Sequence, residues 1–182
     1  MMKCMSVAIR VENTLKTKIC KAQDLIQSKF GVKFQKQNQS FPHINLISGE
    51  VADVGQVYSL IDSISLPDPQ LVSSIGLGCF LTPSPTVFVR YEASKNILSI
   101  RNQLFKNIKF WTSIDYTVNE KIWIPKTTIA CNDVEVFDLS KICTELTVLD
   151  FSSNFRLEAL VALEYSTNQV EIVHKTCNFM TT

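Results

Sequence analysis

The chain has 182 residues, 46% of them hydrophobic and 19% charged, with a formal net charge of +1. This composition is typical of a folded chain, and so small a net charge predicts no strong long-range attraction to nucleic acid or anionic membranes, so any contact with RNA has to be local. No apolar run reaches the roughly 20 residues that cross a bilayer, and Arg10 and Glu12 interrupt the only candidate signal sequence, so we expect a cytoplasmic protein that does not bind membranes.

Strand-like and helix-like periodicities alternate along the chain. Apolar and polar residues alternate in the strand segments, and apolar residues recur every three or four positions in the helical ones. We expect Asp53, Ser94 and Asp138 to be N-caps, and Gly31 to end the first helix. In chain order, the expected elements are a strand at 4–11, a helix at 13–30, a loop at 32–40, a strand at 43–48, a helix at 54–64, strands at 71–80 and 86–91, a helix at 94–105, a strand at 123–130, a helix at 138–149, and a closing hairpin of strands at 156–165 and 170–177. This order predicts an α+β fold with two lobes and a cleft between them.

Two short segments share a pattern that points to a site. Residues 42–47 read Pro-His-Ile-Asn-Leu-Ile, and residues 125–130 read Pro-Lys-Thr-Thr-Ile-Ala. In a strand, residues i and i+2 project to the same face, so each segment presents one pair of polar side chains. The pairs are His43 with Asn45, and Lys126 with Thr128. If the two strands lie side by side, four groups suited to holding a phosphate converge.

The pattern resembles the paired signature of the 2H phosphoesterase superfamily, the group of LigT-like bacterial 2′-5′ RNA ligase proteins and cyclic phosphodiesterases. Its members carry, twice, an apolar strand reading His-x-Thr or His-x-Ser. This chain keeps the first histidine at His43 and the second hydroxyl at Thr128, but it has Asn45 and Lys126 at the other two positions. The resemblance implies one bilobal domain over residues 1–182, with antiparallel sheets lining a central cleft and helices outside.

The resemblance also implies a chemistry in which one imidazole acts as base and the other as acid on a cyclic phosphate. Here His43 remains, whereas a lysine, with an unperturbed pKa of about 10.4, is a poor base unless burial lowers that pKa by about three units. Lys126 still neutralises phosphate, and Asn45 and Thr128 can donate hydrogen bonds to it. We therefore expect His43 and Lys126 as catalytic residues with weak or absent activity, and Asn45 and Thr128 as phosphate-binding residues.

The expected partners are nucleotide or RNA ends that bear phosphate, bound by a monomer without a cofactor or metal. Six cysteines show no Cys-x-x-Cys spacing, and no histidine lies near them at the spacing of a zinc finger, which argues against a zinc site and favours reduced thiols. The alternative is an inactive member of the same superfamily that binds nucleotides, RNA or a protein. A third possibility is an unrelated α+β protein whose motif match is accidental.

Each site residue also has a purely structural interpretation. His43 fits a buried core histidine, Asn45 a cap of a local backbone group, Lys126 a solvated edge residue, and Thr128 an ordinary strand residue.

Further candidates lie outside the two motifs. His174 is a candidate for the missing proton carrier, although a surface position is the simpler interpretation. Among the aromatic residues near the second motif, Trp111 and Tyr116 are the candidates for stacking on a nucleobase rather than packing in the core. Arg90 and Arg101 fit either phosphate steering or isolated surface charge.

Overall fold

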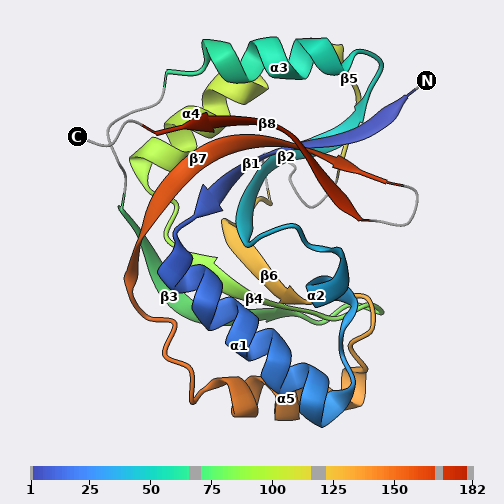
Figure 1. The fold of residues 1–182 in the computed structure, drawn as a ribbon, viewed down its shortest axis with the longest axis vertical. Helices are drawn as coiled ribbons and strands as arrows, with labels where there is room; N and C mark the ends of the chain where they lie inside the picture. The colour runs from blue at the N-terminus through green and yellow to red at the C-terminus, as the bar shows by residue number, and fades with distance from the viewer. Residues whose placement is uncertain (1, 66–70, 116–121, 167–169, 180–182) are drawn as a thin grey trace.

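The structure is a computed structural model that describes residues 2–65, 71–115, 122–166 and 170–179 (Figure 1). In chain order, its elements are β1 (Lys3–Val11), α1 (Asn13–Phe30), α2 (Phe34–Asn38), β2 (His43–Val51), α3 (Val54–Ser63), β3 (Leu71–Phe80), β4 (Thr86–Tyr91), α4 (Lys95–Phe105), β5 (Trp111–Ile114), β6 (Lys126–Ala130), α5 (Leu139–Leu146), β7 (Asn154–Tyr165) and β8 (Glu171–Asn178), with short 3-10 turns at Ile108–Phe110 and Val136–Asp138. No helix in this part of the chain is both long and apolar enough to cross a membrane.

The strands pair in antiparallel fashion in the order β5-β2-β1-β7-β3-β4-β6, with β8 added to β7. The long strand β7 connects two sheets, because its first residues pair with β3 while the rest pairs with β1 and β8. In Figure 1, α3 and α4 lie outside the sheet that contains β1 and β2, and α1 and α5 lie outside the sheet that contains β4 and β6. The expected α+β fold with antiparallel sheets and outer helices is confirmed.

The helix ends follow the local chemistry of the sequence in three of four cases. Gly31 adopts a left-handed conformation (φ 74°), and its N–H donates to Gln27, as expected for a glycine that ends α1. The side chains of Asp53 and Ser94 accept hydrogen bonds from backbone N–H groups at the starts of α3 and α4. Asp138 does occupy the N-cap position of α5, but a 3-10 turn precedes the helix and the Asp138 side chain makes no capping hydrogen bond.

Two further elements depend on contacts that are distant in sequence. The loop expected at 32–40 contains the helix α2, whose first N–H groups, those of Lys33 and Phe34, donate to the Asp133 carboxylate at 2.8 and 2.9 Å. The strand β5 was not expected, and it forms by pairing with the end of β2. Local periodicity predicts neither α2 nor β5, because each is stabilised by a partner elsewhere in the chain.

Candidate functional site

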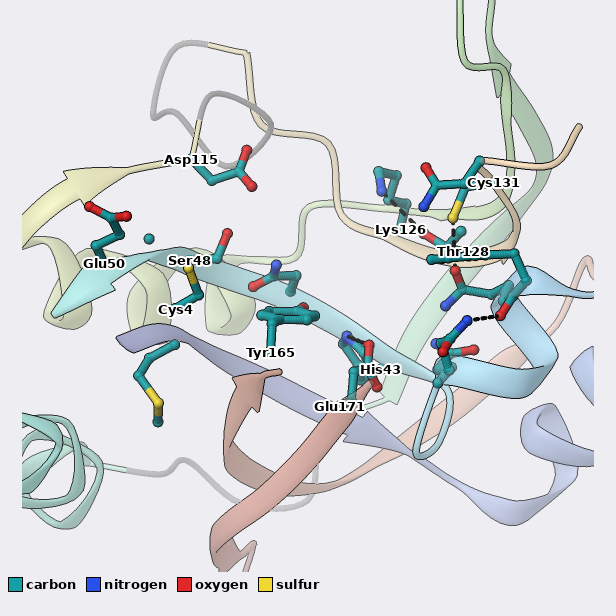
Figure 2. Close-up of a pocket in the computed structure, with 18 of the residues that line it drawn as sticks. Cys4, His43, Ser48, Glu50, Asp115, Lys126, Thr128, Cys131, Tyr165 and Glu171 are labelled. Atoms are coloured by element: carbon teal, nitrogen blue, oxygen red, sulfur yellow. Dashed lines mark hydrogen bonds and ion pairs between the residues drawn. The ribbon is translucent and has the colours of Figure 1, made fainter. Parts of the chain in front are cut away.

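A cavity of about 520 Å³ lies between the two motif strands, β2 and β6 (Figure 2). His43, Asn45, Lys126 and Thr128 all line it, so the structure brings the four sequence-predicted residues together. A volume of this size is within the range of small-molecule sites, about 300–1,000 Å³. The rest of the lining comes from α2, β1, β5, the end of β7 and the start of β8.

The residues between the polar pairs hold the two strands together behind the cavity. Their side chains are fully buried, namely those of Ile44, Leu46, Thr127 and Ile129. The Thr127 hydroxyl donates to the His43 carbonyl at 3.0 Å, and the Trp123 indole N–H donates to the Asn45 carbonyl at 2.9 Å. These bonds run from the second motif to the backbone of the first, so the two polar pairs are held in one relative position.

A β-bulge follows the second polar residue in both motif strands. In β2, the pairing with β1 passes from Asn45 to Ile47 and leaves Leu46 unpaired, and in β6 the pairing with β4 passes from Thr128 to Ala130. One extra residue shifts the side-chain alternation to the other face. Consequently Ser48 and Cys131, each five positions after the first polar residue of its motif, also line the cavity. The two halves of the site thus match in geometry as well as in sequence pattern.

The imidazole of His43 is buried and held from two sides. Its Nδ1 lies 2.9 Å from the Phe41 carbonyl, and because a carbonyl only accepts, Nδ1 is the donor and Nε2 is the free ring nitrogen. Nε2 lies 3.8 Å from Oε1 of Glu171, whose other oxygen accepts from the Ser40 N–H at 3.0 Å. Burial raises the pKa of the Glu171 carboxyl, opposed by the charge of His43 and by the bond from Ser40.

The ammonium of Lys126 lies inside the site, although β6 ends the strand order of the sheet. Its Nζ donates to the Thr128 hydroxyl at 3.3 Å and lies 5.7 and 5.8 Å from the ring centres of Phe88 and Phe80. Burial lowers the pKa of Lys126, and the nearby Cys131 and Asp115 oppose that shift. The structure therefore does not support the interpretation of Lys126 as a solvated edge residue.

Asn45 presents its amide nitrogen as a donor. The Ser6 hydroxyl donates to the side-chain oxygen of Asn45 at 2.8 Å, which leaves the NH₂ group for a ligand oxygen. The side-chain oxygen of Asn45 is therefore bound to Ser6 on β1 and not to a nearby backbone group. The interpretation of Asn45 as a local backbone cap is not supported.

Several lining residues have no counterpart in the sequence prediction. Glu50 and Asp115 place carboxylates on the cavity wall; Figure 2 shows Glu50 beside Ser48, and Asp115 is close enough to Lys126 to affect its pKa. The Cys131 thiol donates to the Gln35 side chain at 2.9 Å, and burial raises its pKa to about 11, so it is a thiol and not a nucleophile at neutral pH. The bulges redirect the ends of the two motif strands toward the cavity, and the pairing of β5 with β2 brings Asp115 there, so no local pattern marks these residues.

His174 and Trp111, two of the candidates outside the motifs, do not line the cavity. His174 lies on β8 and pairs with Glu164 at 2.7 Å, which fits its structural interpretation. Trp111 is buried in the core and stacks on Phe110, so its prediction as a base-stacking residue was wrong. Tyr116 lies outside the described residues.

Neither arginine reaches the site. Arg101 is buried with its guanidinium 4.3 and 4.6 Å from the ring centres of Phe105 and Trp123, and Arg90 is exposed on β4. Within the described ranges, no group of three or more His, Cys, Asp or Glu side chains is arranged to hold a metal ion.

No protein-family model and no curated protein matches the sequence. Solved structures match the fold over nearly the whole chain. Escherichia coli LigT complexed with 3′-AMP superimposes with a TM-score of 0.65 at 13% identity, covering 100% of both chains. TT0787 of Thermus thermophilus gives a TM-score of 0.64 at 13% identity over 97% of both chains, and the apo form of E. coli LigT gives 0.63 at 13% over 99%. The chain therefore has a LigT-like fold, in agreement with the α+β architecture expected from the sequence.

Proposed function

We propose that the cavity binds the phosphate-bearing end of a nucleotide or RNA, and that the protein slowly hydrolyses a 2′,3′-cyclic phosphate or a 2′-5′ linkage there. One observation carries this proposal: two equivalent bulged strands direct His43, Asn45, Lys126 and Thr128 into the same cavity. The presence of 3′-AMP in the LigT structure supports a nucleotide as the ligand.

Three of the four groups are suited to hold the phosphoryl oxygens. The Lys126 ammonium supplies a positive charge, and Asn45 and Thr128 supply donors from the two opposing strands. These donors are fixed by the fold before a ligand arrives, so they stabilise charge that builds on the phosphoryl oxygens without reorganising.

His43 and Lys126 are the groups that exchange protons in this proposal. Nε2 of His43 takes the proton of the attacking water as its oxygen bonds to phosphorus. The bond from phosphorus to the leaving ribose oxygen breaks, and Lys126 gives that oxygen a proton. Burial lowers the pKa of Lys126, which makes it a stronger acid than a solvated lysine. A lysine is still less well matched to neutral pH than a histidine, and since each such group contributes about 100- to 10,000-fold, turnover is slow.

The alternative is a protein that binds the same ligand without cleaving it. The replacement of the second motif histidine by Lys126 favours this alternative, because an ammonium keeps its attraction for phosphate even where it transfers no proton. Binding and turnover therefore have to be measured separately.

The test combines calorimetric titration of 3′-AMP with ³¹P NMR of 2′,3′-cyclic nucleotides incubated with the protein. We expect binding, together with slow formation of a phosphomonoester that His43→Asn abolishes. Binding without turnover would support the alternative. Neither binding nor turnover at millimolar ligand would overturn the proposal.

A further inference from the structure

Glu171, the first residue of β8, places a buried carboxylate in the wall of the proposed site. Its side chain is 6% exposed and that of His43 is 7% exposed, so the pair is out of bulk water. A buried carboxylate is unfavourable unless it has partners. The Ser40 N–H is one partner, at 3.0 Å from Oε2, and the His43 imidazole is a second, with Nε2 3.8 Å from Oε1.

The geometry distinguishes a charge partner from a hydrogen-bond partner. The 3.8 Å from Nε2 to Oε1 is longer than a hydrogen bond, so the carboxylate does not block the lone pair of Nε2. It is short enough that a positive charge on the ring interacts strongly with the carboxylate in this buried place. The Phe41 carbonyl already determines which ring nitrogen carries the proton, so the carboxylate is not needed for that purpose.

We infer that Glu171 is a positioning residue that acts through His43, its carboxylate stabilising the imidazolium that forms when Nε2 accepts a proton. In that step, the O–H bond of the attacking water breaks, an N–H bond forms at Nε2, and Glu171 stays ionised beside the new charge. The buried pair then carries no net charge. This inference rests on the proposed function for its catalytic meaning, while the charge coupling of the two side chains is a property of the folded protein alone.

The other titratable groups near the pair do not replace this coupling. Tyr165 and Cys131 are the neighbours of Glu171 on the cavity wall, and burial raises the pKa of each, so both are neutral at neutral pH. Arg10 lies opposite His43 in the β1–β2 pairing, but its guanidinium forms an ion pair with Glu158 at 3.2 Å.

The protein contains two histidines, and each faces one glutamate, which provides a matched control. Glu171→Gln keeps an oxygen for the Ser40 N–H and removes the charge beside His43. Glu164→Gln removes the charge beside His174, which lies outside the cavity. Ring ¹⁵N NMR between about pH 5 and 8 reports the imidazolium fraction of each histidine. We expect Glu171→Gln to lower that fraction for His43 only, and Glu164→Gln to lower it for His174 only. An unchanged His43 signal in Glu171→Gln would overturn the inference.

The reciprocal measurement uses the carboxyl carbon of Glu171. In His43→Gln the pKa of Glu171 should rise, because the positive charge that lowers it is removed. No change there would also overturn the coupling, even if Glu171→Gln folded poorly.

The catalytic part is tested by kinetics. Glu171→Gln should lower kcat by about 10- to 100-fold with little change in KM, which is less than the loss expected for His43→Asn because Glu171 acts only through that ring. An unchanged kcat would overturn the catalytic role. If NMR shows that Glu171 and His43 are coupled but the wild type cleaves no cyclic nucleotide, the proposed hydrolysis is refuted, whereas the charge coupling of the two side chains is supported.

Discussion

Lys126→Met separates the charge of the site from its shape. Methionine keeps an unbranched apolar side chain that can pack against the rings of Phe80 and Phe88, whose centres now lie 5.8 and 5.7 Å from Nζ. It removes the ammonium that is directed at Thr128 from 3.3 Å. Binding of a phosphate-bearing nucleotide should therefore weaken while the cavity keeps its form.

The size of the loss follows from one charged hydrogen bond to a phosphoryl oxygen. Such a bond contributes about 1.5–3 kcal/mol net, so Kd for 3′-AMP should rise by about 10- to 150-fold. Charge attraction is screened over about 8 Å at physiological ionic strength, so wild-type affinity should fall with added salt, and the fall should be shallower in Lys126→Met. Wild-type affinity should also decline as pH rises through the lowered pKa of Lys126, and the variant should lack that decline.

Isothermal titration at several salt concentrations and pH values measures all three effects. Lys21→Met is the matched control, because Lys21 is exposed on α1 and outside the cavity, so it removes the same net charge without touching the site. If Lys21→Met weakens binding as much as Lys126→Met, or if neither changes it, the cavity is not where the phosphate binds.

Three other substitutions test separate features of the structure. Lys126→His restores two histidines at the motif positions and should raise turnover of a 2′,3′-cyclic nucleotide by about 100-fold. A rate at or below that of the wild type would mean that Lys126 is not at the acid position. Gly49→Ala should lower Tm by about 2–12 °C, because the new Cβ would lie 2.0 Å from the Ser113 carbonyl oxygen and force β5 away at an overpacking cost of about 1–3 kcal/mol; calorimetry showing no loss would mean that β5 moves freely. Glu171→Gln should change the pH dependence of stability: the raised pKa of Glu171 makes the folded state bind more protons, so the wild type loses stability as pH rises from about 4.5 to that raised pKa, and denaturant unfolding of the variant should lack this loss. A variant that shows the same loss would place the titrating group elsewhere.

Elements with local sequence signals could be predicted before the structure was known. Helical spacing identified α1, and Gly31 ended it because glycine adopts the left-handed conformation at low cost. The two-residue alternation of strands placed His43 with Asn45 and Lys126 with Thr128, because side chains two apart project to one face. The likeness of the two motifs predicted the LigT-like fold, which was confirmed although two of the four signature positions differ.

Tertiary structure decided everything that depends on a partner far away in the chain. The bulges at Leu46 and Ile129 are defined only against the neighbouring strands, and they bring Ser48 and Cys131 to the cavity. Glu171 arrives through the pairing of β8 with β7, and no residue near it in sequence indicates that His43 is its neighbour. The pKa of Lys126 is likewise a property of burial, which a strand at the end of a sheet does not predict. Within a regular strand, local pattern predicts which way a side chain points, but the bulges that redirect the strand and the surroundings that set a group's charge form only when distant segments pack together.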